Sequence, residues 1–97
     1  MKALKRIEIV VGAIESKRII RLLEDNDVQE YTLIRNVLGK GTRGEQDGEG
    51  LHDAFQNHYI LIGCEEEKFT KIMEPLREAL KKSGGACMVS DALWLLH

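Results

Sequence analysis

Cysteine, proline and aromatic residues are scarce in this 97-residue chain, which has two cysteines, one proline and 5% aromatic residues. Two cysteines are too few for a disulfide framework and are typical of a reducing compartment, so we expect a cytoplasmic protein. No apolar run approaches the roughly 20 residues of a membrane helix, and the N-terminus carries charges where a signal peptide would be apolar. The formal net charge of −2 provides no basic field, which argues against a nucleic-acid partner.

The residues that are present alternate between strand and helix patterns. Apolar and β-branched runs predict strands, whereas apolar residues at helical spacing predict helices. Strands are expected over residues 7–11, 31–38, 58–64 and 86–95, and helices over residues 13–25 and from about 65 to 83. Pro75 falls inside the second helix and should kink it or divide it in two.

This order of elements predicts an α+β fold of the ferredoxin-like βαββαβ type, in a single domain of residues 1–97. Its four-stranded antiparallel sheet would carry both helices on one face. Ile9–Val11 and Ile60–Ile62 are apolar on both faces of their strands, which is expected where both faces are buried. We therefore expect a homo-oligomer that forms through the sheet face without helices. A monomer with some exposed aliphatic surface is the alternative.

Glycines gather in residues 39–50, between the second and third strands. A connection this long is uncommon in a compact domain unless it has a function. Its glycines permit close approach of the backbone, and Lys40 and Arg43 add cationic donors, so the segment predicts an anion site, most naturally for phosphate. It lacks the ending of a Walker motif. The fold places it at the same edge of the sheet as Gly12 and Gly84–Gly85, although a plain surface loop and simple helix capping remain alternatives.

Other chemistry-bearing residues give weaker patterns. His52 and His58, with Asp53 and Cys64, suggest a metal site but lack a recognised ligand spacing. Cys64 and Cys87 are expected to be core residues on strands that are not neighbours. Trp94 is expected to anchor the core or a subunit interface rather than to contact a ligand. No nucleophile and base stand together, so we expect a protein without catalytic activity.

The element order and two short motifs together resemble the PII-like signalling proteins, above all the branch associated with bicarbonate transporters and carboxysomes. The motifs are Tyr31-Thr32-Leu33 and Gly39-Lys40-Gly41-Thr42-Arg43. The resemblance implies a homotrimer that binds adenine nucleotides in the clefts between subunits. It implies that Gly39, Lys40, Gly41, Thr42 and Arg43 hold the phosphates, that Gly84 and Gly85 supply a second loop, and that Tyr31 and Thr32 reach the nucleotide from the neighbouring subunit. Residues 39–57 would form a flexible T-loop, which ligand orders for recognition by a partner.

The chain also departs from the family pattern. Ala86 stands where classical PII proteins carry a lysine, the C-terminus lacks their paired arginines, and the T-loop lacks the tyrosine that some members modify. These departures favour AMP or ADP over ATP, with cyclic AMP also to be tested. The resemblance further implies bicarbonate as a second ligand and a membrane transporter or carboxysomal protein as partner, without direct insertion into the membrane. The alternative is a metal-binding trimer of the CutA type that uses His52 and His58. Slow nucleotide hydrolysis is a weaker alternative.

Overall fold

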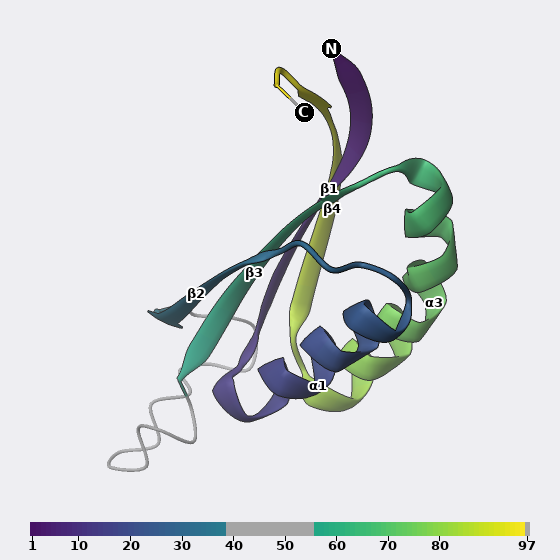
Figure 1. Cartoon of the computed structure of the whole chain (residues 1–97). Coiled ribbons are helices and arrows are strands. Elements are labelled where there is room, and N and C mark those ends of the chain that lie inside the picture. The colour runs from purple at the N-terminus through teal and green to yellow at the C-terminus, as the bar shows by residue number, and fades with distance from the viewer. Residues whose placement is uncertain (39–55, 97) are drawn as a thin grey trace.

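The structure, a computed structural model, describes residues 1–38 and 56–96. The elements follow the expected order: β1 (Lys2–Gly12), α1 (Ala13–Asp25), β2 (Thr32–Val37), β3 (Asn57–Cys64), α3 (Glu66–Ser83) and β4 (Ala86–Trp94). The strands form one antiparallel sheet in the order β2-β3-β1-β4. Both helices cover the same face of that sheet (Figure 1). The structure thus confirms the ferredoxin-like βαββαβ fold.

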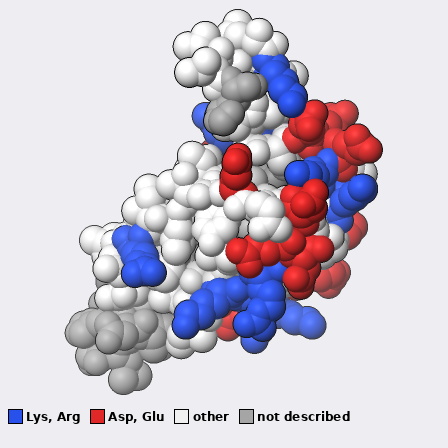
Figure 2. Space-filling view, in the orientation of Figure 1, with Lys and Arg blue, Asp and Glu red and all other residues white. Residues whose placement is uncertain are grey.

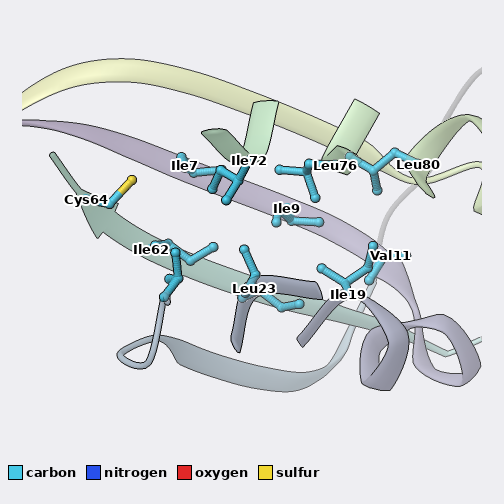
Figure 3. Packing of buried hydrophobic residues seen from close by; sticks show 12 residues of the cluster. Ile7, Ile9, Val11, Ile19, Leu23, Ile62, Cys64, Ile72, Leu76 and Leu80 are labelled. Atoms are coloured by element: carbon cyan, nitrogen blue, oxygen red, sulfur yellow. The ribbon is translucent and has the colours of Figure 1, made fainter. Parts of the chain in front are cut away.

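The hydrophobic core lies between the two central strands and the two helices (Figure 3). Ile7, Ile9 and Val11 alternate along β1 and point toward the helices, as do Ile60 and Ile62 on β3. The helices contribute their apolar stripes, with Ile19 and Leu23 from α1 and Ile72, Leu76 and Leu80 from α3, all buried. This one-sided burial explains why the helical spacing in the sequence located both helices correctly.

β1 begins earlier than the sequence predicted. It starts at Lys2, which pairs with Trp94, and Arg6 pairs with both Gly63 and Ser90. The sequence pattern does not predict this part of the strand, because it contains several charged residues. Lysine and arginine are nevertheless compatible with a strand when their charged ends reach solvent. The two chain termini consequently lie together, at the end of the sheet opposite Gly12 (Figure 1).

α3 continues through Pro75 as one helix of 18 residues, so the predicted division into two pieces is wrong. Pro75 lies on the exposed side, while Ile72 and Leu76 on either side of it are buried in the core. Burial of the apolar stripe on both sides of Pro75 keeps the helix continuous, although the proline lacks the N–H that would bond to residue 71. Neither helix in the described ranges is both long and apolar enough to cross a membrane.

The sheet face without helices carries several apolar side chains. Val10 and Leu61 are half-buried there, and Met88 is 67% exposed.

The two cysteines are free, as expected, and Cys64 is buried, but Cys87 is exposed. The prediction that Cys87 is a core residue is wrong because β4 is an edge strand, which has a neighbour on one side only.

Candidate functional site

Four chain segments that are distant in sequence meet at one edge of the sheet. Gly12, at the end of β1, pairs with Asn57 at the start of β3, and Val37, at the end of β2, pairs with the same Asn57. Val10 pairs with Ala86, which places Gly85 beside the end of β1. We call this the loop edge. The register confirms that the connection between β2 and β3 leaves and returns at the same edge as Gly12 and Gly84–Gly85.

The predicted phosphate-binding residues Gly39, Lys40, Gly41, Thr42 and Arg43 lie outside the described residues, as do His52 and Asp53. The described part of the chain adds cations near this edge. Figure 2 shows basic side chains gathered over α1 and acidic side chains gathered toward the start of α3. Lys17, Arg18 and Arg21 are the exposed cations of α1. The loop edge is therefore on the more basic side of a chain with a net negative charge.

Gly84 and Gly85 both have structural reasons to be glycine. Gly84 caps α3 in the left-handed conformation, with φ of 80°, and its N–H donates to the carbonyl of Leu80 at 2.8 Å. A Cβ at Gly85 would lie 2.9 Å from the carbonyl oxygen of Val10. The Gly85 N–H donates to Ser83 Oγ at 3.3 Å. Both amides are thus occupied within the chain, and this segment offers an anion close backbone approach rather than free donors.

A part-buried polar pair joins α1 to the loop edge. Ser16, on the first turns of α1, is 2% exposed, and its Oγ lies 2.8 Å from His58 Nδ1. Ser16 also donates to the carbonyl of Ala13 at 3.0 Å, so both bonds form together when the His58 Nδ1–H donates to Ser16 Oγ. Burial lowers the pKa of His58, and the positive charge of Arg35 lowers it further. Sequence reasoning missed this pair, because 42 positions separate the two residues.

The structure does not bring the proposed metal ligands together. His58 is the second residue of β3 and Cys64 is its last, six residues further on, or about 20 Å at about 3.3 Å per residue. Cys64 therefore cannot share a metal with His58. Within residues 1–38 and 56–96 no group of three histidine, cysteine or carboxylate side chains is placed to hold a metal ion.

Tyr31 and Thr32 lie far from the loop edge of their own chain. Thr32 opens β2 and pairs with Leu61, five residues before the loop edge at Val37, or about 16 Å along the strand. Tyr31 is half-buried and packs against the hydrophobic core, whereas Thr32 is exposed. A single subunit therefore does not bring these two residues to Gly84 and Gly85.

A cavity of about 350 Å³ lies at this opposite end of the sheet, which we call the terminal edge. Its lining includes Val28 and Gln29 from the connection before β2, Gly63 and Cys64 from the end of β3, and Trp94 from the end of β4. Sequence reasoning missed this cavity. The signal that could have located it is Gly63 inside an otherwise apolar strand, because such a glycine often marks close approach by another group.

Comparisons with known proteins agree with this architecture. The chain matches the family model of the nitrogen regulatory protein P-II over residues 4–95. A search of curated proteins found no match. Among solved structures, it is similar to CPII, a nitrogen regulatory PII-like protein from Thiomonas intermedia K12.

Two CPII structures illustrate the likeness. CPII bound to ADP, AMP and bicarbonate has 24% identity and a TM-score of 0.83, over 95% of this chain and 88% of that one. CPII bound to ADP and bicarbonate has 26% identity and a TM-score of 0.81, with the same two coverages. A Thermus thermophilus protein described as PII-like has 21% identity and a TM-score of 0.76, over 96% and 90%. With a match that spans nearly the whole chain, the protein belongs to the P-II family.

Proposed function

We propose that this protein is a trimeric, non-catalytic sensor of adenine nucleotides, with AMP or ADP as the preferred ligand. One observation carries the proposal: the residues assigned to the nucleotide lie at opposite ends of a single subunit. Gly84 and Gly85 are at the loop edge, and Tyr31 and Thr32 are at the terminal edge. Only a neighbouring subunit can complete such a site. The two sides meet when the loop edge of one subunit faces the terminal edge of the next.

The phosphates in this proposal bind at the loop edge. Gly39, Lys40, Gly41, Thr42 and Arg43 provide the amides and cations there, because the amides of Gly84 and Gly85 are already used within the chain. CPII, which is similar in fold, has been solved with ADP, AMP and bicarbonate, which supports the choice of nucleotide. We propose bicarbonate as the second ligand on the same grounds.

Signalling in this proposal runs through residues 39–57, the T-loop. Nucleotide at the base of the loop orders it, and its acidic remainder then contacts a protein partner. We propose a membrane transporter or a carboxysomal protein as that partner, in line with the bicarbonate-associated branch. The protein itself would work in the cytoplasm.

Calorimetry tests the ligand. AMP, ADP, ATP and cyclic AMP are titrated separately into the full chain, with and without bicarbonate, and AMP or ADP should bind most tightly. If none of the four nucleotides gives a measurable heat of binding at millimolar concentration, the proposal is wrong. Equilibrium dialysis with zinc and copper, run beside it, should find no tight stoichiometric metal.

Substitutions at the base of the loop test the assigned residues. Lys40→Ala and Arg43→Ala each remove a charge-assisted hydrogen bond to phosphate, so each should weaken ADP binding about tenfold or more. Their stability should stay within about 0.5 kcal/mol of the parent, because neither residue belongs to the hydrophobic core. Lys71→Ala removes an exposed cation from α3 and is the matched control. Equal affinities in all three variants would contradict the assignment.

A further inference from the structure

The outer side of α1 carries a row of exposed cations. Lys17, Arg18 and Arg21 are exposed, and because Arg21 follows the other two by about one turn, all three share one side of the helix. Ile19 and Leu23 lie on the opposite side and are buried in the core. We call the three cations the basic strip. It faces away from the sheet, so burial of the helix-free face in an oligomer leaves it uncovered.

Two cations of the basic strip are not neutralised within the subunit. In residues 1–38 and 56–96 neither Lys17 nor Arg21 has an ion-pair partner, whereas Arg18 pairs with Glu15 at 3.3 Å. The last turn of α3, which ends at the loop edge, adds two further exposed lysines. Because α1 and α3 contact each other, positive charge collects on one part of the helix layer (Figure 2).

The stability of α1 does not explain these charges. The helix dipole favours anions in the first turn and cations in the last turn. α3 follows this rule at both ends, with glutamates first and lysines last. α1 has Glu15 in its first turn but no cation in its last turn, where Glu24 and Asp25 stand instead. Its cations therefore lie where they do little for the helix, which points to a partner outside the subunit.

An exposed isoleucine lies among the cations. Ile14 is 67% exposed, and around the helix axis its position falls between those of Lys17 and Arg18. An aliphatic side chain beside cations suits the surface of an anionic membrane, where apolar groups enter the boundary of the acyl chains and cations remain at the phosphates. A soluble polyanion would engage the cations and leave the isoleucine in water.

From these features we propose that the basic strip and Ile14 bind the headgroup surface of an anionic membrane. Each subunit of the proposed trimer carries one strip, and rotational symmetry inclines all strips in the same sense to its axis, so one membrane can engage them together. The acidic side chains toward the start of α3 are repelled by the same surface, which turns the loop edge toward the membrane (Figure 2). This inference goes beyond nucleotide sensing and rests on the proposed function only for the trimer.

Vesicle sedimentation tests the proposal on the intact protein. Phosphatidylcholine vesicles that contain phosphatidylserine should bind it, and vesicles of phosphatidylcholine alone should not. Added sodium chloride should weaken the binding, because it screens the attraction between the cations and the headgroups. Equal binding to both kinds of vesicle, or to neither, would overturn the proposal. Neither result bears on nucleotide binding, which calorimetry measures separately.

Paired variants separate the strip from net charge. Lys17→Gln combined with Arg21→Gln should weaken vesicle binding about tenfold or more, since each cation near an anionic surface contributes about fivefold. Lys71→Gln combined with Arg77→Gln removes the same charge from exposed positions of α3 and should stay within about twofold of the parent. An equal loss in both double variants would contradict a role of the strip. Affinity for ADP should be unchanged in both.

Ile14→Ser distinguishes a membrane from an acidic protein. It should weaken vesicle binding about threefold or more, because the side chain loses apolar contact with the lipid. Labelled polyglutamate, a soluble model of an acidic protein, is titrated beside the vesicles and monitored by fluorescence anisotropy. Tighter binding to polyglutamate than to the vesicles, lost in the Lys17 and Arg21 double variant but kept in Ile14→Ser, would assign the strip to an acidic protein and overturn the membrane proposal.

Discussion

At the scale of single residues, this chain uses glycine and histidine in ways that depend on one or two close contacts. A side chain at position 85 would clash with the carbonyl oxygen of Val10, and one at position 63 would clash with the indole of Trp94. Position 84 requires glycine because its backbone is in the left-handed conformation. Each of these constraints comes from a partner that is remote in sequence or from backbone conformation. His58 differs from these glycines in that its surroundings act on its charge: burial and the positive charge of Arg35 lower its pKa.

His58 should make the folded protein less stable in mild acid. Burial and Arg35 lower its pKa in the folded state, whereas the unfolded chain titrates near the ordinary value of about 6.5. Between these two values the unfolded state binds more protons, so stability is fully present above about pH 6.5 and is lost as the pH falls through the folded pKa. Urea unfolding at intervals from about pH 7.5 to about pH 5.0 measures this loss.

The control for this prediction is His58→Gln, which cannot take up a proton. Carboxylates throughout the chain also respond to acid, so the decisive quantity is the difference between the two proteins. The parent should lose more unfolding free energy than the variant over the same pH interval. The same dependence on pH in both proteins would show that His58 contributes nothing to it.

At the scale of elements, α3 carries an internal cost that its packing outweighs. Proline in a helix interior is about 3 kcal/mol less favourable than alanine, and Pro75 is exposed, so its side chain adds little burial in return. Pro75→Ala should therefore raise the free energy of unfolding by about 1–3 kcal/mol in urea titrations. Lys71→Ala, on the same helix, should change it by less than about 0.5 kcal/mol. A destabilised alanine variant would mean that the proline has a structural role.

The elements differ in how well the sequence predicts them. α1 was located at 13–25, as observed, because its apolar spacing is regular and the residues after Asp25 end it. The predicted range of β1, residues 7–11, is too short because the charged residues before it have the composition of a loop. Cys87 was misplaced because sequence pattern does not tell an edge strand from a central one.

The sequence also predicts some parts of the candidate site and not others. Topology predicts that Gly12, Gly84–Gly85 and the two ends of the connection between β2 and β3 lie at one edge of the sheet, and the register confirms this placement. The roles of Gly39–Arg43 stay a prediction, because these residues lie outside the described ranges. The Ser16–His58 pair and the wall formed by Trp94 could not be. Both depend on contacts between side chains of different elements, and a local sequence pattern does not predict such contacts.

At the scale of the whole molecule, the face of the sheet without helices is suited to burial in an oligomer. Its apolar members include Val10, Leu61 and Met88. Four polar side chains of this face are paired within the subunit: Tyr59 donates to Glu8 at 2.8 Å, and Arg6 donates to Ser90 at 3.1 Å. Burying this face would therefore leave these polar groups paired, which removes the largest cost of covering them.

Met88→Lys tests this interface against a matched control. Met88 lies beside Glu8 on the helix-free face, so a lysine there is tolerated by an isolated subunit but costly once the face is covered. The variant should dissociate at concentrations where the parent is a trimer, as measured by light scattering after size-exclusion chromatography. Ile14→Lys, equally exposed at 67% but on α1, should remain trimeric.

Nucleotide binding should fall together with assembly, because each proposed site needs two subunits. Met88→Lys leaves the loop edge and the Tyr31–Thr32 segment unchanged within each subunit, yet it should lose ADP affinity at concentrations where it is monomeric. Raising the protein concentration, and with it the fraction of trimer, should restore ADP binding. A monomeric variant that binds ADP as tightly as the parent would place the whole nucleotide site within one chain and contradict the shared-site geometry.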